Sequence, residues 1–498
     1  LLAKALYQSN DLRQLSVVSH EAPWFMNFGA KDNNLGTIGN IEKILPELQG
    51  IKANFELADS LLRQNKQNFL AFPIKIYWRL FDSGIRQQKE ELEAIIQKLE
   101  LMLDLGGYSS AVHYLLVFQD DAFLTPDGGI VWGYADAVVE RGQLKRWEIV
   151  PAYKITTPAS IYPADWPKEL NFVPFPSWYP DWSAKARLLQ NYFKEQYLAN
   201  QLAYVSQNYF SGVVALNTSV LGDLLPATSS EDWISWQHCV ALQQNNCPQK
   251  DDLVNFLSDL PQKIVQFKPS RAEDWQTSIK QRLERGDIRI YLNNVTLQYL
   301  VKERGWTGGI KKWTNDYLWI GDTNLSPDKT TDWQINKQLH YKIEDSGKII
   351  IAEAELLYAN LGAQEYQSMV EAIVPMGIDI MEADGVDIKK LILYNWRQYS
   401  VLRVPITVPA GEIKKVMLRY QLPEFLREKL SKLGYRLAVI KQPGRKINNL
   451  KVDLSFANKI QLYNPTGFSV ARNEDKRIVW ITDLKNDKIF DVWFRETN

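Results

Sequence analysis

The hydrophobic period of this chain changes along its length, and that change limits the folds that it can adopt. In the first part, apolar residues are separated by seven, four, three and four positions, at Ile85, Leu92, Ile96, Leu99 and Leu103. This spacing places one apolar seam on a helix and predicts helical structure over residues 1–110. We expect the seam to pack against a helix around residues 41–64, as a hairpin or stalk; an oligomerising coiled coil is the alternative.

After Gly106 and Gly107 the period becomes that of strands. Short apolar runs occupy residues 113–118, 130–139 and 144–150. The elements expected after them are a loop rich in Trp, Tyr and Pro, a helix at 183–201, a buried strand at 212–216 and a short helix at 218–225. Strands followed by helices in this order predict a mixed α/β domain over residues 111–345.

The last part of the chain has a third pattern. Short alternating segments recur between Gly, Pro and Asn, at residues 349–359, 391–394, 401–407, 415–421, 435–441, 450–456, 477–482 and 489–494. This spacing predicts an antiparallel β-sandwich over residues 346–498. A length of 498 residues suits such a division, because one domain spans about 150 residues. The predicted fold class is therefore α+β and multidomain, with a helical hairpin, a mixed α/β domain and a C-terminal antiparallel β-sandwich.

Charge and aromatic content narrow the classes of function. The chain has 58 Lys and Arg and 58 Asp and Glu, so its formal net charge is zero. A general nucleic-acid binder carries a basic surplus, so we expect no nucleic-acid partner. The 17 Trp and 23 Tyr are side chains that fill β-rich cores or grip sugars, lipids and proteins. A membrane-spanning helix needs about 18 consecutive apolar residues, and no run in the sequence approaches that length.

Cysteine and histidine provide few candidates for chemistry. Cys239 and Cys247 lie eight positions apart and could close a disulfide in an oxidising compartment; in the cytosol they would stay a reduced pair. Only His238 lies nearby as a further ligand, so we predict no zinc site. The four histidines show no metal-ligand spacing, and no dinucleotide, phosphate-loop or serine-hydrolase motif is present.

Four carboxylates are the candidate catalytic residues. Asp120, Asp121 and Asp127 belong to an acidic turn, and Asp181 belongs to the element Trp-Tyr-Pro-Asp-Trp. Paired carboxylates can hold a divalent cation such as Mg²⁺, or act as acid and base. The alternative is ordinary turn chemistry, because Asp is common in tight turns with Gly. We therefore expect no cofactor, with Mg²⁺ only if these carboxylates form a reaction centre.

The loop over residues 162–182, named the aromatic loop here, is unusually rich in aromatic residues and proline. Its candidate ligand-binding residues are Tyr162, Trp166, Phe175, Trp178, Tyr179 and Trp182, and Phe172 is a seventh aromatic residue. Five prolines stiffen its backbone. Such a loop can close over the core as a plug, or it can line a groove for polyprenyl chains or sugar rings. Both interpretations stay open at the level of the sequence.

Five sequence blocks resemble the bacterial domain-of-unknown-function 4012 family in the same order. The first is YLLVFQDDAFLTPDGGIVWGYADAVVERGQL from residue 114. The others are WYPDW from 178, GVVALNTSVLGDLL from 212, GWTG from 305 with DYL and NL after it, and YRLAVIKQPG from 435. The resemblance covers residues 110–455. It implies an extracytoplasmic protein anchored by a membrane helix before Leu1, and a central domain distantly similar to LytR-CpsA-Psr phosphotransferases.

The departures from the family pattern bear on function. Thr125 stands where the family has Arg, Asp127 stands where it has Thr, and Ser211 stands where it has Asp. An Arg-Asp pair of the family aligns with Pro174 and Phe175. Arginine is the residue that grips a pyrophosphate with two prongs, and threonine does not replace its charge. We therefore expect this region to have lost positive charge and the domain to act as a scaffold.

Three functions follow as hypotheses. The first is an envelope or surface protein with a structural or binding role, whose partners are an envelope protein or a second copy of itself. The second is a phosphotransferase that moves a polysaccharide from a polyprenyl pyrophosphate lipid, using the four carboxylates and Mg²⁺. The third is a carbohydrate-binding module without catalysis. We favour the first, because no complete catalytic constellation is visible in the sequence.

Overall fold

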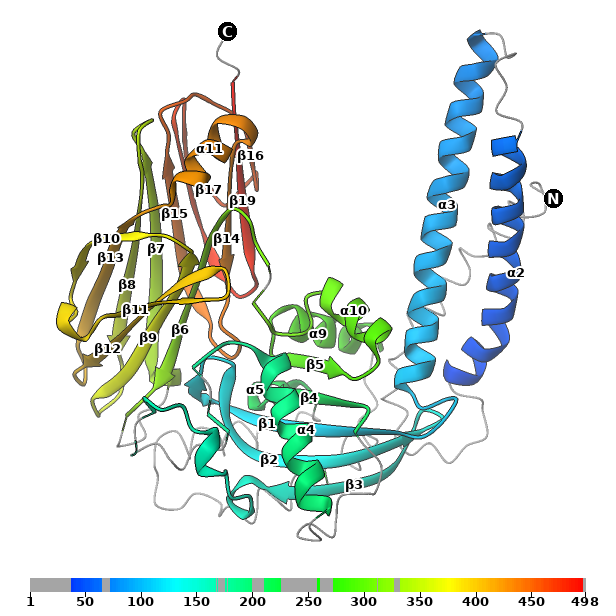
Figure 1. Cartoon of the computed structure of the whole chain (residues 1–498), viewed down its shortest axis with the longest axis horizontal. Helices are drawn as coiled ribbons and strands as arrows, with labels where there is room; N and C mark the ends of the chain where they lie inside the picture. Colours follow the sequence, from blue (N-terminus) through cyan, green and yellow to red (C-terminus); the bar gives the residue numbers. More distant parts are fainter. Residues whose placement is uncertain are drawn as a thin grey trace.

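The computed structural model describes residues 37–64, 72–166, 168, 175–176, 178–198, 210–224, 258–259, 272–310, 312–326 and 332–495. These residues form helices and three mixed β-sheets, and most of the regular structure is sheet (Figure 1). None of the helices within these ranges combines the length and the apolar character that a bilayer-spanning helix requires. The predicted disulfide pair, Cys239 and Cys247, lies outside the described residues.

Two long helices, α2 (Thr37–Gln64) and α3 (Phe72–Leu105), precede the sheets and lie side by side (Figure 1). Lys52 lies 3.7 Å from Glu93, and Gln49 donates a hydrogen bond of 3.2 Å to Glu100. Residue numbers rise along α2 while they fall along α3, so the two helices run antiparallel. The facing apolar residues are buried: Leu48, Ile51, Phe55, Leu92, Ile96, Leu99 and Leu103.

A five-stranded sheet in the order β3-β2-β1-β4-β5 follows. Its strands are β1 (Val112–Thr125), β2 (Gly128–Glu140), β3 (Gln143–Pro151), β4 (Gly212–Asn217) and β5 (Ile288–Leu292). β1 and β4 are parallel, and the other neighbours are antiparallel. The parallel pair places the carboxyl ends of two strands next to each other at one edge of the sheet.

Helices cover both faces of this sheet. They are α4 (Trp182–Leu198), α5 (Thr218–Leu224), α9 (Ala272–Glu284) and α10 (Val295–Glu303). Leu115 and Val117 of β1 share a buried cluster with α4. The alternate residues Tyr114 and Phe118 share clusters with α10 and α5 on the opposite face. Both faces are therefore buried, which explains the nearly continuous apolar runs in the sequence.

The remaining strands form two seven-stranded sheets that pack face to face. One has the order β10-β13-β8-β7-β15-β18-β17 and the other β11-β12-β9-β6-β14-β19-β16. The bounds are β6 (Asp316–Asn324), β7 (Ile335–Asp345), β8 (Ile350–Asn360), β9 (Tyr366–Pro375), β10 (Asp379–Asp384), β11 (Ile392–Trp396), β12 (Tyr399–Val408), β13 (Ile413–Gln421), α11 (Glu424–Leu433), β14 (Tyr435–Ile440), β15 (Ile447–Ser455), β16 (Ile460–Asn464), β17 (Val470–Glu474), β18 (Arg477–Leu484) and β19 (Lys488–Phe494). One large apolar cluster joins both sheets.

These two sheets differ from the expected antiparallel sandwich. β14 pairs parallel with β6, and β15 pairs parallel with β7, so both sheets are mixed. The expected boundary at 345/346 falls between β7 and β8, which pair with each other over their whole length. β6 is buried at every position, and the second half of β9 is buried on both faces. The alternation that reveals a half-exposed strand is absent from such segments, so the sequence did not predict them.

The aromatic packing under α4 gives a testable prediction. Phe193 is buried, and its ring centroid lies 4.9 Å from Tyr134, 5.6 Å from Tyr192 and 6.3 Å from Phe210. We expect Phe193→Ala to lower the free energy of unfolding by about 3–5 kcal/mol, because it leaves a cavity between rings. Urea denaturation measures this loss. Leu188→Ala, at a partly exposed position of the same helix, should change the free energy by about 0.5 kcal/mol or less.

Candidate functional site

The candidate site lies at the carboxyl ends of the parallel strands β1 and β4, which end side by side. We call this end of the five-stranded sheet its carboxyl edge. Gln119 of β1 is in register with Asn217 of β4 at this edge. In open α/β sheets, ligands bind outside the carboxyl ends of neighbouring strands. Asp120 and Asp121 follow Gln119 directly, so two of the candidate carboxylates lie at this edge.

Asp120 and Asp121 are held by the start of α5. The Thr218 hydroxyl lies 2.7 Å from Asp121 Oδ1 and 3.4 Å from Asp120 Oδ1, and the Ala122 N–H donates to Asp120 Oδ1 at 3.0 Å. Burial, with the neighbouring carboxylates of Asp121 and Asp332, raises the pKa of Asp120 to about 7. Burial also raises the pKa of Asp121. Two carboxyl groups thus share one hydroxyl in a buried space.

Asp127 lies in a different environment, at the β1–β2 turn. Its Oδ2 is 2.9 Å from Lys185 Nζ of α4, and both side chains are buried. Its Oδ1 accepts a hydrogen bond of 2.8 Å from the Thr125 hydroxyl. The carboxylate is therefore neutralised by a lysine of the same domain. No local pattern in the sequence indicates this pair, because Lys185 is one of several polar residues on a helix.

Arg289 of β5 is a residue at this edge that the sequence patterns did not single out. Its fully buried guanidinium donates to Gln119 Oε1 at 2.6 Å, to Asn217 Oδ1 at 2.7 Å and to the main-chain oxygen of Asp127. It lies 5.5 Å from the Trp182 ring, and burial lowers its pKa to about 10. The sequence patterns predicted no cation for this region, but the structure places Arg289 and Lys185 beside Asp127, from distant parts of the sequence.

Glycine at two positions makes room for the Arg289 side chain, one at its guanidinium and one at its aliphatic part. A Cβ atom on Gly128 would lie 2.2 Å from Arg289 Nη1, and one on Gly308 would lie 2.5 Å from Arg289 Cδ. Both glycines also have positive φ, at +133° and +58°. Arg289 therefore explains the first glycine of the acidic turn, whereas a Cβ atom on the second, Gly129, would lie 2.1 Å from the main-chain oxygen of Asp120 on the paired strand.

The sandwich covers the carboxyl edge with the loop between β14 and β15 (residues 441–446), called the β14–β15 loop here. Gln442 Nε2 donates to the carbonyl of Thr125 at 3.0 Å and to the carbonyl of Asp322 at 2.7 Å. A Cβ on Gly444 would lie 3.0 Å from Asn217 Nδ2, Asp121 Cβ and Leu124 Cδ2. The loop thus occupies the position at which an α/β sheet would present a ligand site.

A second contact joins the same loop to the edge. Lys441 Nζ donates to the carbonyl of Arg285 at 2.7 Å and lies 3.3 Å from Asp287 Oδ1. Arg282 Nη1 lies 3.1 Å from the other oxygen of Asp287. Burial alone would raise the pKa of Asp287, but Lys441 and Arg282 hold it below its ordinary value.

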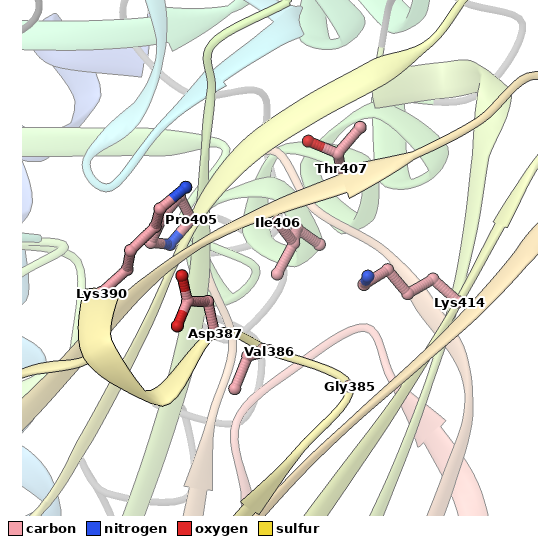
Figure 2. A pocket seen from close by; sticks show the side chains of 8 residues that line it. All are labelled: Gly385, Val386, Asp387, Lys390, Pro405, Ile406, Thr407 and Lys414. Carbon is pink, nitrogen blue, oxygen red and sulfur yellow. The ribbon is translucent and has the colours of Figure 1, made fainter.

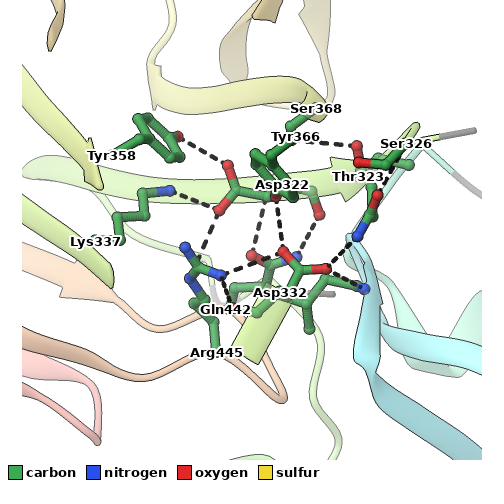
Figure 3. A network of polar contacts seen from close by, with 12 residues as sticks. Asp322, Thr323, Ser326, Asp332, Lys337, Tyr358, Tyr366, Ser368, Gln442 and Arg445 are labelled. Carbon is green, nitrogen blue, oxygen red and sulfur yellow. Dashed lines mark hydrogen bonds and ion pairs between the residues drawn. The ribbon is translucent and has the colours of Figure 1, made fainter. Parts of the chain in front are cut away.

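Behind this loop a charged network lies inside the sandwich (Figure 3). Asp322 accepts a hydrogen bond of 2.8 Å from Lys337, and Arg445 Nε lies 3.8 Å from the same carboxylate. Arg445 Nη1 lies 3.2 Å from Asp332, in the 3₁₀ helix η6 (Asp332–Gln334). Asp332 Oδ2 also accepts from the main-chain N–H of Leu124 at 2.9 Å. The tyrosines that donate to the two carboxylates are Tyr358 and Tyr366.

The network is electrically balanced, with two carboxylates and two cations. Burial lowers the pKa of Lys337 to about 8. Burial alone would raise the pKa of Asp322, but Lys337 and Arg445 hold it below its ordinary value. Buried charges of this kind are costly unless they are paired and hydrogen-bonded. Because Asp332 also accepts a hydrogen bond from the Leu124 N–H, the end of β1 takes part in satisfying this network.

Asp181 contacts different groups from the other three candidate carboxylates. Its Oδ1 accepts the Ala184 N–H at 3.1 Å, three residues on, as a cap of α4. Its Oδ2 forms an ion pair with Arg397 in the β11–β12 turn. Asp120 and Asp121 therefore share Thr218, whereas Asp127 and Asp181 each pair with a different cation. In the part of the chain that the structure describes, no group of three or more His, Cys, Asp or Glu side chains is arranged to hold a metal ion.

The described part of the aromatic loop packs against its surroundings. Trp166 and Trp178 lie 4.5 Å apart between centroids and share a buried cluster with Met369 of β9. Arg403 of β12 lies 4.4 Å from the Trp178 ring. Phe175 and Trp182, the first residue of α4, share a buried cluster with that helix. Tyr179 is stacked on Trp396 at 4.7 Å, and half-buried Tyr162 packs on the Trp166 and Trp178 cluster. These contacts favour the plug interpretation of the loop.

A shallow hollow of about 410 Å³ lies elsewhere, at one side of the sandwich (Figure 2). Its lining residues are Gly385, Val386, Asp387, Lys390, Pro405, Ile406, Thr407 and Lys414. None of the carboxylates or aromatic residues that the sequence singled out lines it. The hollow therefore does not belong to the carboxyl edge.

Comparisons with known proteins give limited similarity. No family model and no curated protein matches the chain. A putative nutrient-binding protein from Legionella pneumophila is 9% identical with a TM-score of 0.24, over 32% of this chain and 67% of that chain. Yeast LTA4 hydrolase with bestatin is 6% identical with a TM-score of 0.20, over 32% and 29%. An M1 zinc metallopeptidase from Deinococcus radiodurans is 8% identical with a TM-score of 0.18, over 30% and 38%. The chain therefore spans well under half the length of the last two proteins.

The buried pair of Lys185 and Asp127 gives a second prediction. Lys185→Met leaves the buried carboxylate without its cation, so we expect the free energy of unfolding to fall by about 3–5 kcal/mol. Adding Asp127→Asn removes the uncompensated charge and should recover about 1 kcal/mol or more. Urea denaturation of the two single variants and the double variant measures this coupling. Additive losses would contradict a direct ion pair.

The raised pKa of Asp120 gives a third prediction, about pH. Its folded-state pKa lies above its ordinary value, so its contribution to stability is complete below about pH 4 and is lost as the pH rises through 7. Asp120→Asn cannot titrate. Its free energy of unfolding should therefore rise relative to the native protein between pH 4 and 8, by about 1.4 kcal/mol for each pH unit between the ordinary and raised pKa.

Chemical denaturation at a series of pH values measures this difference. Asp379→Asn, at an exposed position of β10, controls for the loss of one surface charge. Parallel pH profiles for native protein and Asp120→Asn would show that Asp120 ionises normally in the folded state.

Proposed function

We propose that this chain is a structural scaffold of the extracytoplasmic cell envelope rather than an enzyme. The observation that carries the proposal is the β14–β15 loop, which fills the carboxyl edge of the five-stranded sheet with Gln442 and Gly444. A catalytic domain needs an accessible space at its reacting groups. Here that space holds part of the same chain.

The proposed scaffold consists of three parts. A helical stalk formed by α2 and α3 leads to a mixed α/β domain, and a β-sandwich is locked to that domain. The resemblance to the 4012 family supports an extracytoplasmic location and an anchor through a membrane segment upstream of Leu1. A stalk, a rigid joint and a sandwich with two free edges are parts that suit contacts with an envelope protein or with another copy.

The contacts of the carboxylates favour this role over the phosphotransferase alternative. That alternative needs Asp120, Asp121, Asp127 and Asp181 around one divalent cation. Asp127 is instead neutralised by Lys185, and Asp181 caps α4 and pairs with Arg397. The guanidinium of Arg289 is occupied by Gln119, Asn217 and the Asp127 carbonyl. A pyrophosphate would have to displace these internal partners.

Gly444→Ala tests the locked joint. Gly444 has φ +77° and close neighbours on the sheet edge, whereas Gly411 has φ +71° and no heavy atom within 4 Å of the place that a Cβ would take. The two substitutions impose similar backbone strain, but only the first also places a Cβ atom 3.0 Å from atoms of the sheet edge. We expect calorimetry to give one unfolding transition for native protein and Gly411→Ala, and two separated transitions for Gly444→Ala.

Two results would contradict the scaffold. One is separate unfolding of the α/β domain and the sandwich in the native protein. The other is Mg²⁺-dependent transfer of glycan from a polyprenyl-pyrophosphate donor by the purified chain, abolished by Asp121→Asn in a variant that keeps the native unfolding transition.

A further inference from the structure

The sheet that contains β6 and β14 ends in two outer strands of equal length and similar character. β11 and β16 have five residues each, and neither contains a charged residue or proline. Their sequences are Ile-Leu-Tyr-Asn-Trp and Ile-Gln-Leu-Tyr-Asn. Each pairs with one neighbouring strand only within the described part of the chain. A free edge of β-prone, uncharged residues is a template for pairing with another strand.

The other sheet of the sandwich provides an internal comparison. Its outer strand β10 carries Asp379, Glu382 and Asp384, and its outer strand β17 carries Arg472 and Glu474. Charged side chains on an outer strand hinder pairing with a further strand. One sheet of the molecule therefore has both edges blocked by charge, whereas the other sheet has both edges unblocked.

The two unblocked strands also expose apolar side chains. Ile392 and Leu393 of β11 are 47% and 45% exposed, and Leu462 of β16 is 61% exposed. Trp493, in register with Leu462 on β19, is 42% exposed. Apolar area at both ends of one sheet would be removed from water if the sheet continued into another molecule.

The direction of the strands permits that continuation. From β11 to β16 the strand direction reverses at five antiparallel pairs and is kept at the parallel pair of β6 and β14. β16 therefore runs antiparallel to β11, at the opposite end of the sheet (Figure 1). A second copy moved sideways along the sheet presents its β16 antiparallel to β11 of the first, which is the more stable pairing.

We propose that copies of this chain associate head to tail, with β11 of one copy paired with β16 of the next. The contact is heterologous, so it leaves one free β11 and one free β16 at the ends and can add further copies. This contact makes a second copy of the same chain the partner of the proposed scaffold. The biological role of the contact therefore rests on that proposed function. The pairing itself needs only the sandwich edges.

Complementation between two edge variants tests the proposal in the full chain. Leu393→Lys places a charge on β11, and Leu462→Lys places one on β16. Sedimentation velocity over a concentration series should show association of the native protein. Each variant alone should associate at least about tenfold more weakly. An equimolar mixture should form a 1:1 dimer and stop there, because only one compatible pair of edges remains.

Met381→Lys is the matched control, since it adds the same charge at an exposed position of β10 on the other sheet. It should associate like the native protein. Calorimetry of all variants must give the native unfolding transition, which separates loss of pairing from loss of folding.

Three outcomes would overturn the proposal. They are a native protein that stays monomeric at all concentrations, a Leu462→Lys variant that still dimerises through β11 alone, and a mixture that contains no dimer. Calorimetry tests the joint between the α/β domain and the sandwich, whereas sedimentation velocity tests the pairing of β11 with β16. Failure of the pairing is therefore distinguishable from failure of the scaffold.

Discussion

The arrangement depends on one contact, the insertion of the β14–β15 loop at the carboxyl edge of the five-stranded sheet. Gln442 links the Thr125 carbonyl of one unit to the Asp322 carbonyl of the other through a single amide group. Gly444 allows the loop to lie close to Asp121 and Asn217, where a Cβ atom would be only 3.0 Å from the nearest atoms. Without this loop the buried carboxylates of the edge would face a space that water or a ligand could enter.

Charge makes the contact specific. Asp332 binds Arg445 within the sandwich and the Leu124 N–H of β1, and Lys441 binds Asp287 at the start of β5. Separating the two units would leave several of these groups without a partner, and an unpaired buried charge is far more costly than a paired one. The same network therefore fixes one relative position of the two units. Such a fixed position is what the scaffold role that we propose requires.

The sequence predicted the elements whose residues alternate or repeat locally. The strands expected at 113–118 and 130–139 and the helix expected at 183–201 correspond to β1, β2 and α4, although β1 extends to Thr125. Arg289 and Lys185 could not be predicted, because they meet Asp127 from strands and helices 162 and 58 positions away. β6 could not be predicted for a related reason. It contains Asp316 and Asp322, which are fully buried, and these two residues make its sequence resemble that of a polar loop.

Hydrogen exchange resolved by mass spectrometry tests the central claim most directly, because it compares the two sides of the joint in the native protein. If the β14–β15 loop and the carboxyl edge form one cooperative unit, amides of residues 114–125 and 437–446 should exchange through openings of the same free energy. They should also respond together when urea is added. Fast exchange of 437–446 while 114–125 stays protected would contradict the account, since the loop would then lift from the edge without disturbing it.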